Sequence, residues 1–231
     1  MAVRDAPRTE PRRRRGLRAL SVALIVAGVL VLADGLLTLA WQEPLTAGYA
    51  ALRQDRLEDR LATLERSPLP AAERRAVARL PDPRRRLAFR ARALGRRSAP
   101  GDPLGRLRVP AIGLSTVVVE GTDPDKLRAG PGHYPDTVLP GQRGTVALAG
   151  HRTTYGAPFR ELDELDPGDR IDIAMPYGRF AYRVERTRIV PATAVGVVAD
   201  TGRHKLVLTA CHPLFSAEER IVVVARPGRM R

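Results

Sequence analysis

Three reactive side chains stand at the edges of short apolar segments in the second half of this 231-residue sequence. Cys211 ends one such segment, His151 follows a second, and Arg220 directly precedes a third. A thiolate is a good nucleophile, an imidazole exchanges protons near neutral pH, and a guanidinium stabilises an oxygen that gains negative charge. The combination predicts acyl transfer through a covalent intermediate on the cysteine.

The segments themselves indicate how these groups converge. Residues 206–211 read as an apolar strand that His212 and Pro213 end, and Arg220 opens the strand that follows the next loop. A hairpin of this kind places Cys211 and Arg220 near each other at one end of a sheet. His151 also stands at a strand terminus, so we expect the three side chains to form the rim of an active site.

Each residue also has a simpler interpretation. A lone cysteine is often a buried apolar side chain, and a single histidine or arginine is often structural or exposed. A metal site formed by His133, His151, Cys211 and His212 is a further alternative. Structural zinc usually uses paired ligands two to four residues apart, and this set lacks such a pair, so we expect neither metal nor cofactor. A non-enzymatic scaffold protein also stays open.

The elements that must position these residues are mainly strands. From residue 105 onward the sequence is rich in Val, Ile and Thr and is punctuated by turn signals at 166–169 and 176–178. A helix start is expected at 122–124 and a short helix at 158–165. So many short strands in about 120 residues predict an all-β fold, a closed or nearly closed barrel. The predicted strands are 107–110, 112–120, 145–150, 170–175, 179–190, 205–209 and 221–226.

The motifs around the three reactive residues resemble those of the sortases of Gram-positive bacteria, and most closely those of class E. The resemblance covers residues 105–227 and implies an eight-stranded sortase-type barrel with short helices. Its specific motifs are Leu-Ala-Gly-His-Arg-Thr-Thr-Tyr-Gly-Ala-Pro-Phe at 148–159 and Leu-Thr-Ala-Cys-His-Pro at 208–213. Gly-Pro-Gly-His-Tyr-Pro at 130–135 and Leu-Pro-Gly-Gln at 139–142 support them.

The resemblance implies a role for each reactive residue and a reaction. Cys211 matches the nucleophile, His151 the general acid and base, and Arg220 the residue that stabilises the oxyanion or orients the substrate. The implied enzyme is a cysteine transpeptidase that cleaves a sorting signal like LAxTG or LPxTG between Thr and Gly. It would form a thioacyl intermediate and transfer secreted proteins to a peptidoglycan amine. Candidates for lining the peptide groove are Tyr134, Arg152, Tyr155, Thr209 and Ala210.

The chain departs from the family pattern at three positions. Ala210 and Val207 stand where the family usually has threonine, and Phe215 stands where class E members often have tyrosine. A catalytically weak or inactive relative therefore stays an alternative. A pilin-polymerising sortase is another, but such enzymes often have a second, C-terminal membrane span. We expect none here, which favours attachment of single proteins to the wall.

An apolar segment at residues 19–41 predicts a membrane anchor. At 1.5 Å per residue, this helix is long enough to cross a hydrocarbon layer of about 30 Å. The region before it, residues 1–18, is basic, which predicts a cytoplasmic tail and an extracellular catalytic domain at 105–231. A secretory signal has a shorter apolar region of about 7–15 residues. A cleaved signal and a buried helix are the alternatives.

Residues 42–104 are predicted to form a stalk and linker. A helical stripe of Ala50, Leu57, Leu61 and Leu64 predicts a stalk helix over 43–66. The remainder has six prolines and ten arginines against three acidic residues, so we expect a tether with one short helix at 71–80. It would be a solvated spacer or would contact anionic lipids or wall polymers. The net charge of +14 lacks interleaved aromatic residues, so nucleic acid is not an expected partner.

Overall fold

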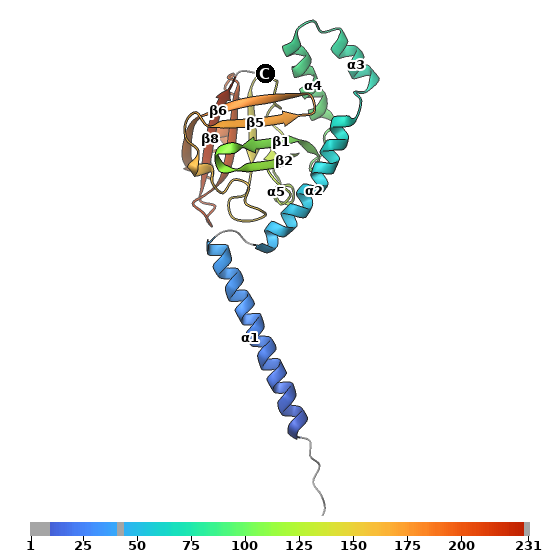
Figure 1. The fold of residues 1–231 in the computed structure, drawn as a ribbon. Coiled ribbons are helices and arrows are strands. Elements are labelled where there is room, and N and C mark those ends of the chain that lie inside the picture. Colours follow the sequence, from blue (N-terminus) through green and yellow to red (C-terminus); the bar gives the residue numbers. More distant parts are fainter. Residues whose placement is uncertain (1–9, 41–43, 229–231) are drawn as a thin grey trace, which may run out of the picture. The chain divides into compact units, whose positions relative to one another are not determined.

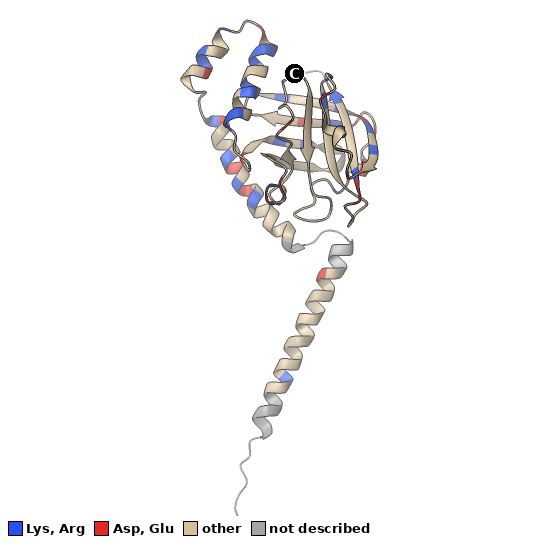
Figure 2. Cartoon of the chain, turned by 180° about the vertical axis from the view of Figure 1, so that it is seen from behind, with Lys and Arg blue, Asp and Glu red and all other residues tan. Residues whose placement is uncertain are grey.

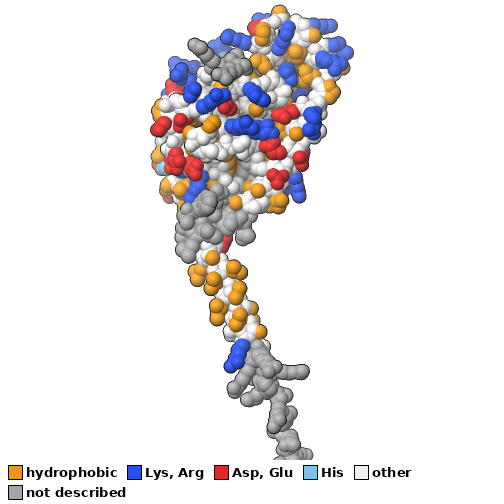
Figure 3. Space-filling model, in the orientation of Figure 1, with side chains coloured by type: hydrophobic (Ala, Val, Ile, Leu, Met, Phe, Trp, Pro, Cys, Tyr) orange, Lys and Arg blue, Asp and Glu red, His pale blue; other side chains and the backbone are white. Residues whose placement is uncertain are grey.

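The computed structural model describes residues 10–40 and 44–228, and the chain divides into two compact units, Met1–Pro44 and Leu45–Arg231. The first unit holds helix α1 (Glu10–Ala40). Within it, Gly16–Gly35 is long and apolar enough to cross a membrane, and Figure 3 shows its exposed apolar side chains. The predicted span at 19–41 overlaps this segment, with Trp41 and residues 1–9 outside the described residues.

The second unit contains a closed barrel of eight strands, so the predicted fold class is confirmed (Figure 1). Around the barrel the strands follow the order β1-β2-β3-β4-β7-β8-β6-β5. The pairs β2–β3 and β4–β7 are parallel, and the other pairs are antiparallel. The strands are β1 (Pro103–Val109), β2 (Leu114–Glu120), β3 (Gly132–His133), β4 (Thr145–Ala149), β5 (Arg170–Met175), β6 (Gly178–Pro191), β7 (Lys205–His212) and β8 (Glu219–Pro227).

The pattern of burial explains which strands the sequence reveals. In β5 the buried residues Ile171, Ile173 and Met175 alternate with more exposed ones, as in a strand with one face on the core. Strands β4 and β7 are buried on both faces over most of their length, and they appear in the sequence as continuous apolar runs. Strand β3 has only two residues, too few for any pattern, and the sequence did not predict it.

Short helices connect the strands. Helix α5 (Pro124–Leu127) follows Asp123 and confirms the predicted helix start. The predicted helix at 158–165 contracts to one 3₁₀ turn, η2 (Leu162–Glu164). Two further 3₁₀ turns are η1 (Pro110–Ile112) and η3 (Val195–Val198).

Helix α2 (Pro44–Arg66) packs against the barrel. Its Leu57 and Leu61 form a buried cluster with Val117 and Val119 of β2. The Gln54 side chain accepts a hydrogen bond from the backbone N–H of Val117 at 2.7 Å. The stripe predicted for a stalk helix is therefore a packing face of the folded unit.

Helices α3 (Ala71–Ala78) and α4 (Pro83–Arg97) occupy the segment that was predicted to be a tether with one helix. Asp82 caps α4 by accepting a hydrogen bond from the backbone N–H of Arg84 at 2.8 Å, and Pro83 occupies the first turn. Ala91 and Leu94 belong to the main core. The Asp82-Pro83 pair therefore starts a second helix in a segment that was predicted to be mainly an irregular tether. Both helices carry arginines (Figure 2).

Truncation of Leu61 tests whether α2 is part of the folded unit. Leu61 is fully buried and Leu52, on the same helix, is 64% exposed. We expect Leu61→Ala to lower the free energy of unfolding by about 2–5 kcal/mol because it leaves a cavity, whereas Leu52→Ala changes it little. Urea unfolding of the full chain in neutral detergent measures both. Equal, small effects would mean that α2 is a detached stalk.

Candidate active site

Strand register brings the three reactive residues to one end of the sheet. Cys211 of β7 lies directly opposite Arg220 of β8 in the antiparallel pair. On the other side of β7, the parallel partner β4 aligns Ala149 with Thr209, and the backbone N–H of Gly150 donates to the Thr209 carbonyl at 3.1 Å. His151 stands two residues beyond Ala149, as Cys211 stands two beyond Thr209. The register therefore places His151 and Arg220 on opposite sides of Cys211.

The alternation of side chains puts the three residues on the outer face of the barrel. Along β7, Leu206, Leu208 and Ala210 belong to the main core, which leaves Cys211 on the outside. Val222 and Val224 of β8 belong to a separate cluster on the outer face. Arg220 lies two residues before Val222 on the same strand, so its side chain belongs to the same face. Ala147 of β4 lies in the same cluster. If the alternation of side chains continues from Ala147 through Gly150, His151 also faces the outside of the barrel.

The turn after β4 holds the backbone of His151. A Cβ atom on Gly150 would lie 2.6 Å from the ring of Phe159, so only glycine fits there. Phe159 is fully buried, and its backbone N–H donates to the His151 carbonyl at 3.0 Å. The motif at 148–159 therefore folds back on itself, and the phenylalanine fixes the residue that follows β4.

The imidazole of His151 has an unpaired nitrogen. Its Nε2 is buried and has no hydrogen-bond partner among the described residues. Burial, and next the positive charge of Arg128, lower the pKa of His151 below its ordinary value, so the neutral ring is favoured. A buried polar atom without a partner is costly, which makes this nitrogen a natural contact for a bound ligand.

The other two groups are accessible to a ligand. Cys211 is a free, partly exposed thiol. The Nη1 of Arg220 donates to the carbonyls of Ala217 and Glu219, each at 3.0 Å. Within the described part of the chain, the N–H groups on its Nε and Nη2 have no partner. They are the donors that Arg220 can offer to an oxygen of a substrate.

The predicted groove residues have different surroundings. The Tyr134 hydroxyl hydrogen-bonds to Oγ1 of the buried Thr209 at 3.0 Å, on the face that carries Cys211. Tyr155 lies beside His151, with 5.2 Å between ring centroids. The Ala210 side chain belongs to the barrel core, so only its backbone can reach a ligand on the outer face.

Arg152 makes contacts within the protein. Its side chain is buried and donates from Nε to the Arg160 carbonyl at 3.1 Å and from Nη2 to Asp163 at 2.6 Å. Its Nη1 lies 3.0 Å from Nδ1 of His212. These contacts join the turn after β4 to the residue after Cys211, so Arg152 connects the two segments that carry the reactive groups.

Two of the histidines considered as metal ligands have partners inside the protein. The His133 ring lies 2.9 Å from the Glu120 carboxylate and 3.1 Å from the Thr137 hydroxyl, and His212 contacts Arg152. Among the described residues, no group of three or more His, Cys, Asp or Glu side chains is arranged to hold a metal ion.

Residues that sequence reasoning did not single out surround Tyr155. The backbone N–H of Tyr155 donates to the Thr46 hydroxyl of α2 at 3.0 Å, and the Tyr49 ring lies edge-on with centroids 6.2 Å apart. The Arg128 guanidinium lies 5.7 Å from the centroid of the Tyr155 ring. More than 100 residues separate Thr46 and Tyr49 from Tyr155 in the sequence, so no local pattern could have revealed these contacts.

Substitution of Arg128 tests the electrostatic surroundings of His151. We expect Arg128→Gln to raise the pKa of His151 toward its ordinary value, because removal of a nearby cation makes the imidazolium less unfavourable. NMR titration of the His151 ring measures the shift. Arg108→Gln, on the outer face of β1, is the control and should leave the titration unchanged. An unchanged or lowered pKa in Arg128→Gln would contradict this account.

The barrel segment of this chain is similar to known proteins. The Sortase domain family model matches residues 107–228, more than half of the chain. Sortase D of Bacillus subtilis is 37% identical over 130 residues, which cover 54% of this chain and 64% of that protein. Sortase SrtE1 of Streptomyces coelicolor is 31% identical over 143 residues, 54% of this chain and 40% of the relative. The chain thus spans less than two thirds of the length of these relatives.

Solved structures extend the likeness to the fold. The structure of sortase E1 from Streptomyces coelicolor with a tripeptide in its active site matches with a TM-score of 0.54 and 29% identity, over 58% of this chain and 93% of that one. A Clostridium perfringens sortase D5 transpeptidase shares the fold over 77% of this chain and 99% of its own, with a TM-score of 0.61 and 20% identity. Since the family model matches more than half of the chain, from within β1 to the end of β8, this chain belongs to the sortase family.

Proposed function

We propose that this protein is a membrane-anchored cysteine transpeptidase that uses Cys211, His151 and Arg220. The observation that carries the proposal is the strand register, which sets Cys211 opposite Arg220 and beside the turn that carries His151. Family membership supports a transpeptidase reaction, and the unpaired Nε2 of His151 supports a ligand at this site.

In the proposed first step, the Cys211 thiolate attacks the carbonyl carbon of the scissile peptide bond. Arg220 donates hydrogen bonds to the oxygen that becomes negatively charged. The carbon–nitrogen bond breaks as the His151 imidazolium gives its proton to the leaving amine. The products are a thioacyl intermediate on Cys211, a neutral His151 and the C-terminal fragment of the substrate, which leaves with a free amino group.

In the second step, an amine attacks the thioacyl carbon. His151 takes the proton of the incoming amine, the carbon–sulfur bond breaks and the thiolate of Cys211 is restored. The lowered pKa of His151 favours the neutral ring that this step needs, and it reduces the share of the imidazolium that the first step needs. We propose that the acceptor is an amino group of a peptidoglycan precursor.

The proposed substrate is a secreted protein with a sorting signal like LAxTG or LPxTG, cleaved between Thr and Gly. The tripeptide in the active site of sortase E1 from Streptomyces coelicolor supports a peptide ligand. We propose that Tyr134, Tyr155, Thr209 and the backbone of Ala210 contact this peptide. The buried contacts of Arg152 support a positioning role for it, through the turn after β4 and His212.

The α1 helix supports anchoring of the enzyme in a membrane. The segment Gly16–Gly35 is long and apolar enough to span the bilayer, and arginines precede it in the sequence. By the positive-inside rule, the proposed orientation has a cytoplasmic N-terminus and an extracellular barrel.

The substitution at Ala210 does not favour an inactive relative. Its side chain lies in the barrel core, on the opposite side of β7 from Cys211. Loss of a hydroxyl at this position therefore removes no side-chain group from the outer face, where the proposed reaction takes place. We expect a working enzyme.

A peptide assay with the full chain in neutral detergent tests the reaction. With a fluorescent LAxTG peptide and hydroxylamine, we expect a hydroxamate product from the wild type and none from Cys211→Ala. His151→Ala should lose about 10²–10⁴-fold of the rate, because general acid–base catalysis contributes about that much. Arg220→Lys should lose about 10²-fold or more, because one oxyanion donor contributes about 10²–10³-fold.

Matched controls and the intermediate complete this test. His204→Ala and Arg203→Lys change exposed residues of the same types and should keep the wild-type rate. Without an amine, mass spectrometry should detect an acyl adduct on Cys211 that hydroxylamine removes. Turnover by Cys211→Ala, or a folded wild type that leaves sorting peptides uncut, would refute the proposed function.

A further inference from the structure

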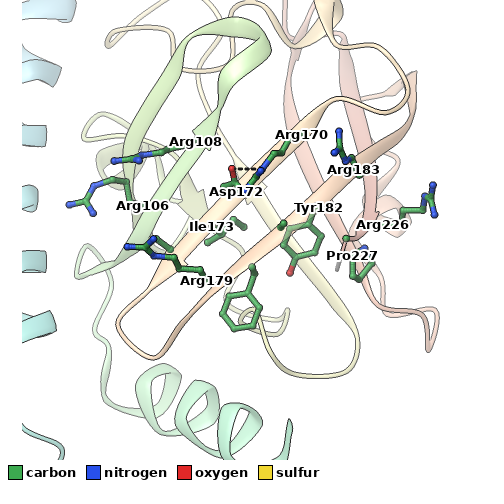
Figure 4. A pocket seen from close by; sticks show the side chains of 14 residues that line it. Arg106, Arg108, Arg170, Asp172, Ile173, Arg179, Tyr182, Arg183, Arg226 and Pro227 are labelled. Carbon is green, nitrogen blue, oxygen red and sulfur yellow. Dashed lines mark hydrogen bonds and ion pairs between the residues drawn. The ribbon is translucent and has the colours of Figure 1, made fainter. Parts of the chain in front are cut away.

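A band of arginines lines a hollow of about 680 Å³ on the outer face of β1, β5, β6 and β8 (Figure 4). The band lies away from the candidate active site: Arg226 stands six residues beyond Arg220 along β8, about 20 Å at 3.3 Å per residue. The proposed transpeptidase chemistry makes no use of it. The charged residues of this hollow, hereafter the arginine trough, are Arg106, Arg108, Arg170, Asp172, Arg179, Arg183 and Arg226.

Strand register places three of these arginines side by side. Arg170 of β5 is paired with Arg183 of β6, and Arg183 is in turn paired with Arg226 of β8. Like charges that lie directly opposite each other on neighbouring strands are destabilising. The sheet therefore holds a row of three cations at a cost in stability, and a bound anion would remove this repulsion.

Few carboxylates compensate the charge. Asp172 accepts hydrogen bonds from Nε of Arg170 at 2.7 and 2.9 Å, and Arg106 pairs with Glu58 of α2. Within the described residues, Arg108, Arg179 and Arg226 form no ion pair, and Arg183 donates to the Gly168 carbonyl at 2.8 Å. Arg106 pairs with Glu58 and Arg170 with Asp172, so four of the six arginines have no carboxylate partner among the described residues, which keeps the trough positive. Figure 3 shows blue side chains on this face of the molecule, with red carboxylate groups among them.

Small side chains make the surface concave. Ala174 lies between Arg106 and Arg179 in the register, and on β6 Ala181 separates Arg179 from Arg183. The aromatic residues at the base, Phe180 and Tyr182, are 6% and 5% exposed, so they offer no ring on which a base could stack. A concave surface with six arginines, one aspartate and a single exposed apolar residue, Pro227, fits a chain of anions better than a flat lipid layer.

We propose that the arginine trough binds a linear polyanion that carries phosphate groups. The planar guanidinium donates hydrogen bonds to phosphate oxygens, and the row Arg170–Arg183–Arg226 presents three guanidiniums in succession, each with N–H groups beyond those that Asp172 and the Gly168 carbonyl accept. Such a site would hold the enzyme on an anionic polymer outside the membrane, independently of turnover at Cys211.

Binding of linear polyphosphate to the full chain in zwitterionic nanodiscs tests this proposal. We expect the double variant Arg183→Gln, Arg226→Gln to bind about tenfold or more weakly. The slope of log affinity against log salt should fall by about 1.4–1.8, at about 0.7–0.9 for each lost phosphate contact. The control Arg74→Gln, Arg75→Gln removes two exposed arginines of α3 and should bind within about twofold of wild type, because its charges lie outside the trough.

Thermal stability gives a second readout, in which the substitution that weakens polyphosphate binding is expected to stabilise the free protein. Without polyphosphate, Arg226→Gln should raise the thermal midpoint, because it removes one member of the self-repelling row. With polyphosphate, the wild type should gain stability and the variant should gain less. A residue that only supports the fold would lower the midpoint when it is replaced.

Three results would overturn the proposal. If the trough variant and the α3 variant lost affinity for polyphosphate equally, binding would depend only on the net charge of the protein. The trough would be assigned to lipid headgroups if the double variant lost binding of the nanodisc-held protein to anionic vesicles but kept its binding of polyphosphate. Tighter binding of single-stranded DNA than of polyphosphate at equal charge would assign it to nucleic acid.

Discussion

The parallel pairing of β4 with β7 is the constraint on which the candidate site depends. These two strands are distant in sequence, and residues 145–149 align one by one with 205–209. The antiparallel β8 then lies on the other side of β7. Because a shift of one residue would turn every side chain to the opposite face, this register decides whether His151, Cys211 and Arg220 share a surface. Burial on both faces holds strands β4 and β7 in this register.

The reactive end of the sheet is supported from several sides. Phe159 packs where Gly150 has no side chain, Arg152 joins the turn after β4 to His212, and α2 contacts Tyr155 through Thr46. Burial of this turn has an electrostatic consequence, since the loss of water around His151 favours the neutral imidazole. Packing and proton chemistry are therefore linked at this residue.

The described arginines of α3 and α4 and those of the arginine trough have different structural settings. On α3 and α4 the arginines are mostly exposed to solvent on helices, where they repel one another weakly. On the outer face of β5, β6 and β8 the register forces three of them into one row. We infer a cost in stability at defined positions only for the second setting, because like charges lie directly opposite each other there. That difference separates the arginine trough from the general basic character of the sequence.

Local patterns were enough to predict the fold class, the apolar segment of α1 and most strands, because alternation, β-branched residues and turn signals depend only on neighbouring residues. The sequence also identified Cys211, His151 and Arg220 as reactive residues at strand ends, and their roles stay proposals. The order of the strands, the two-residue β3 and the packing of α2 and α4 were decided by tertiary structure. They depend on contacts between distant residues, such as Leu61 with Val117. For the same reason, Arg170, Arg183 and Arg226 became a row only when β5, β6 and β8 paired, since no spacing along the chain encodes that register.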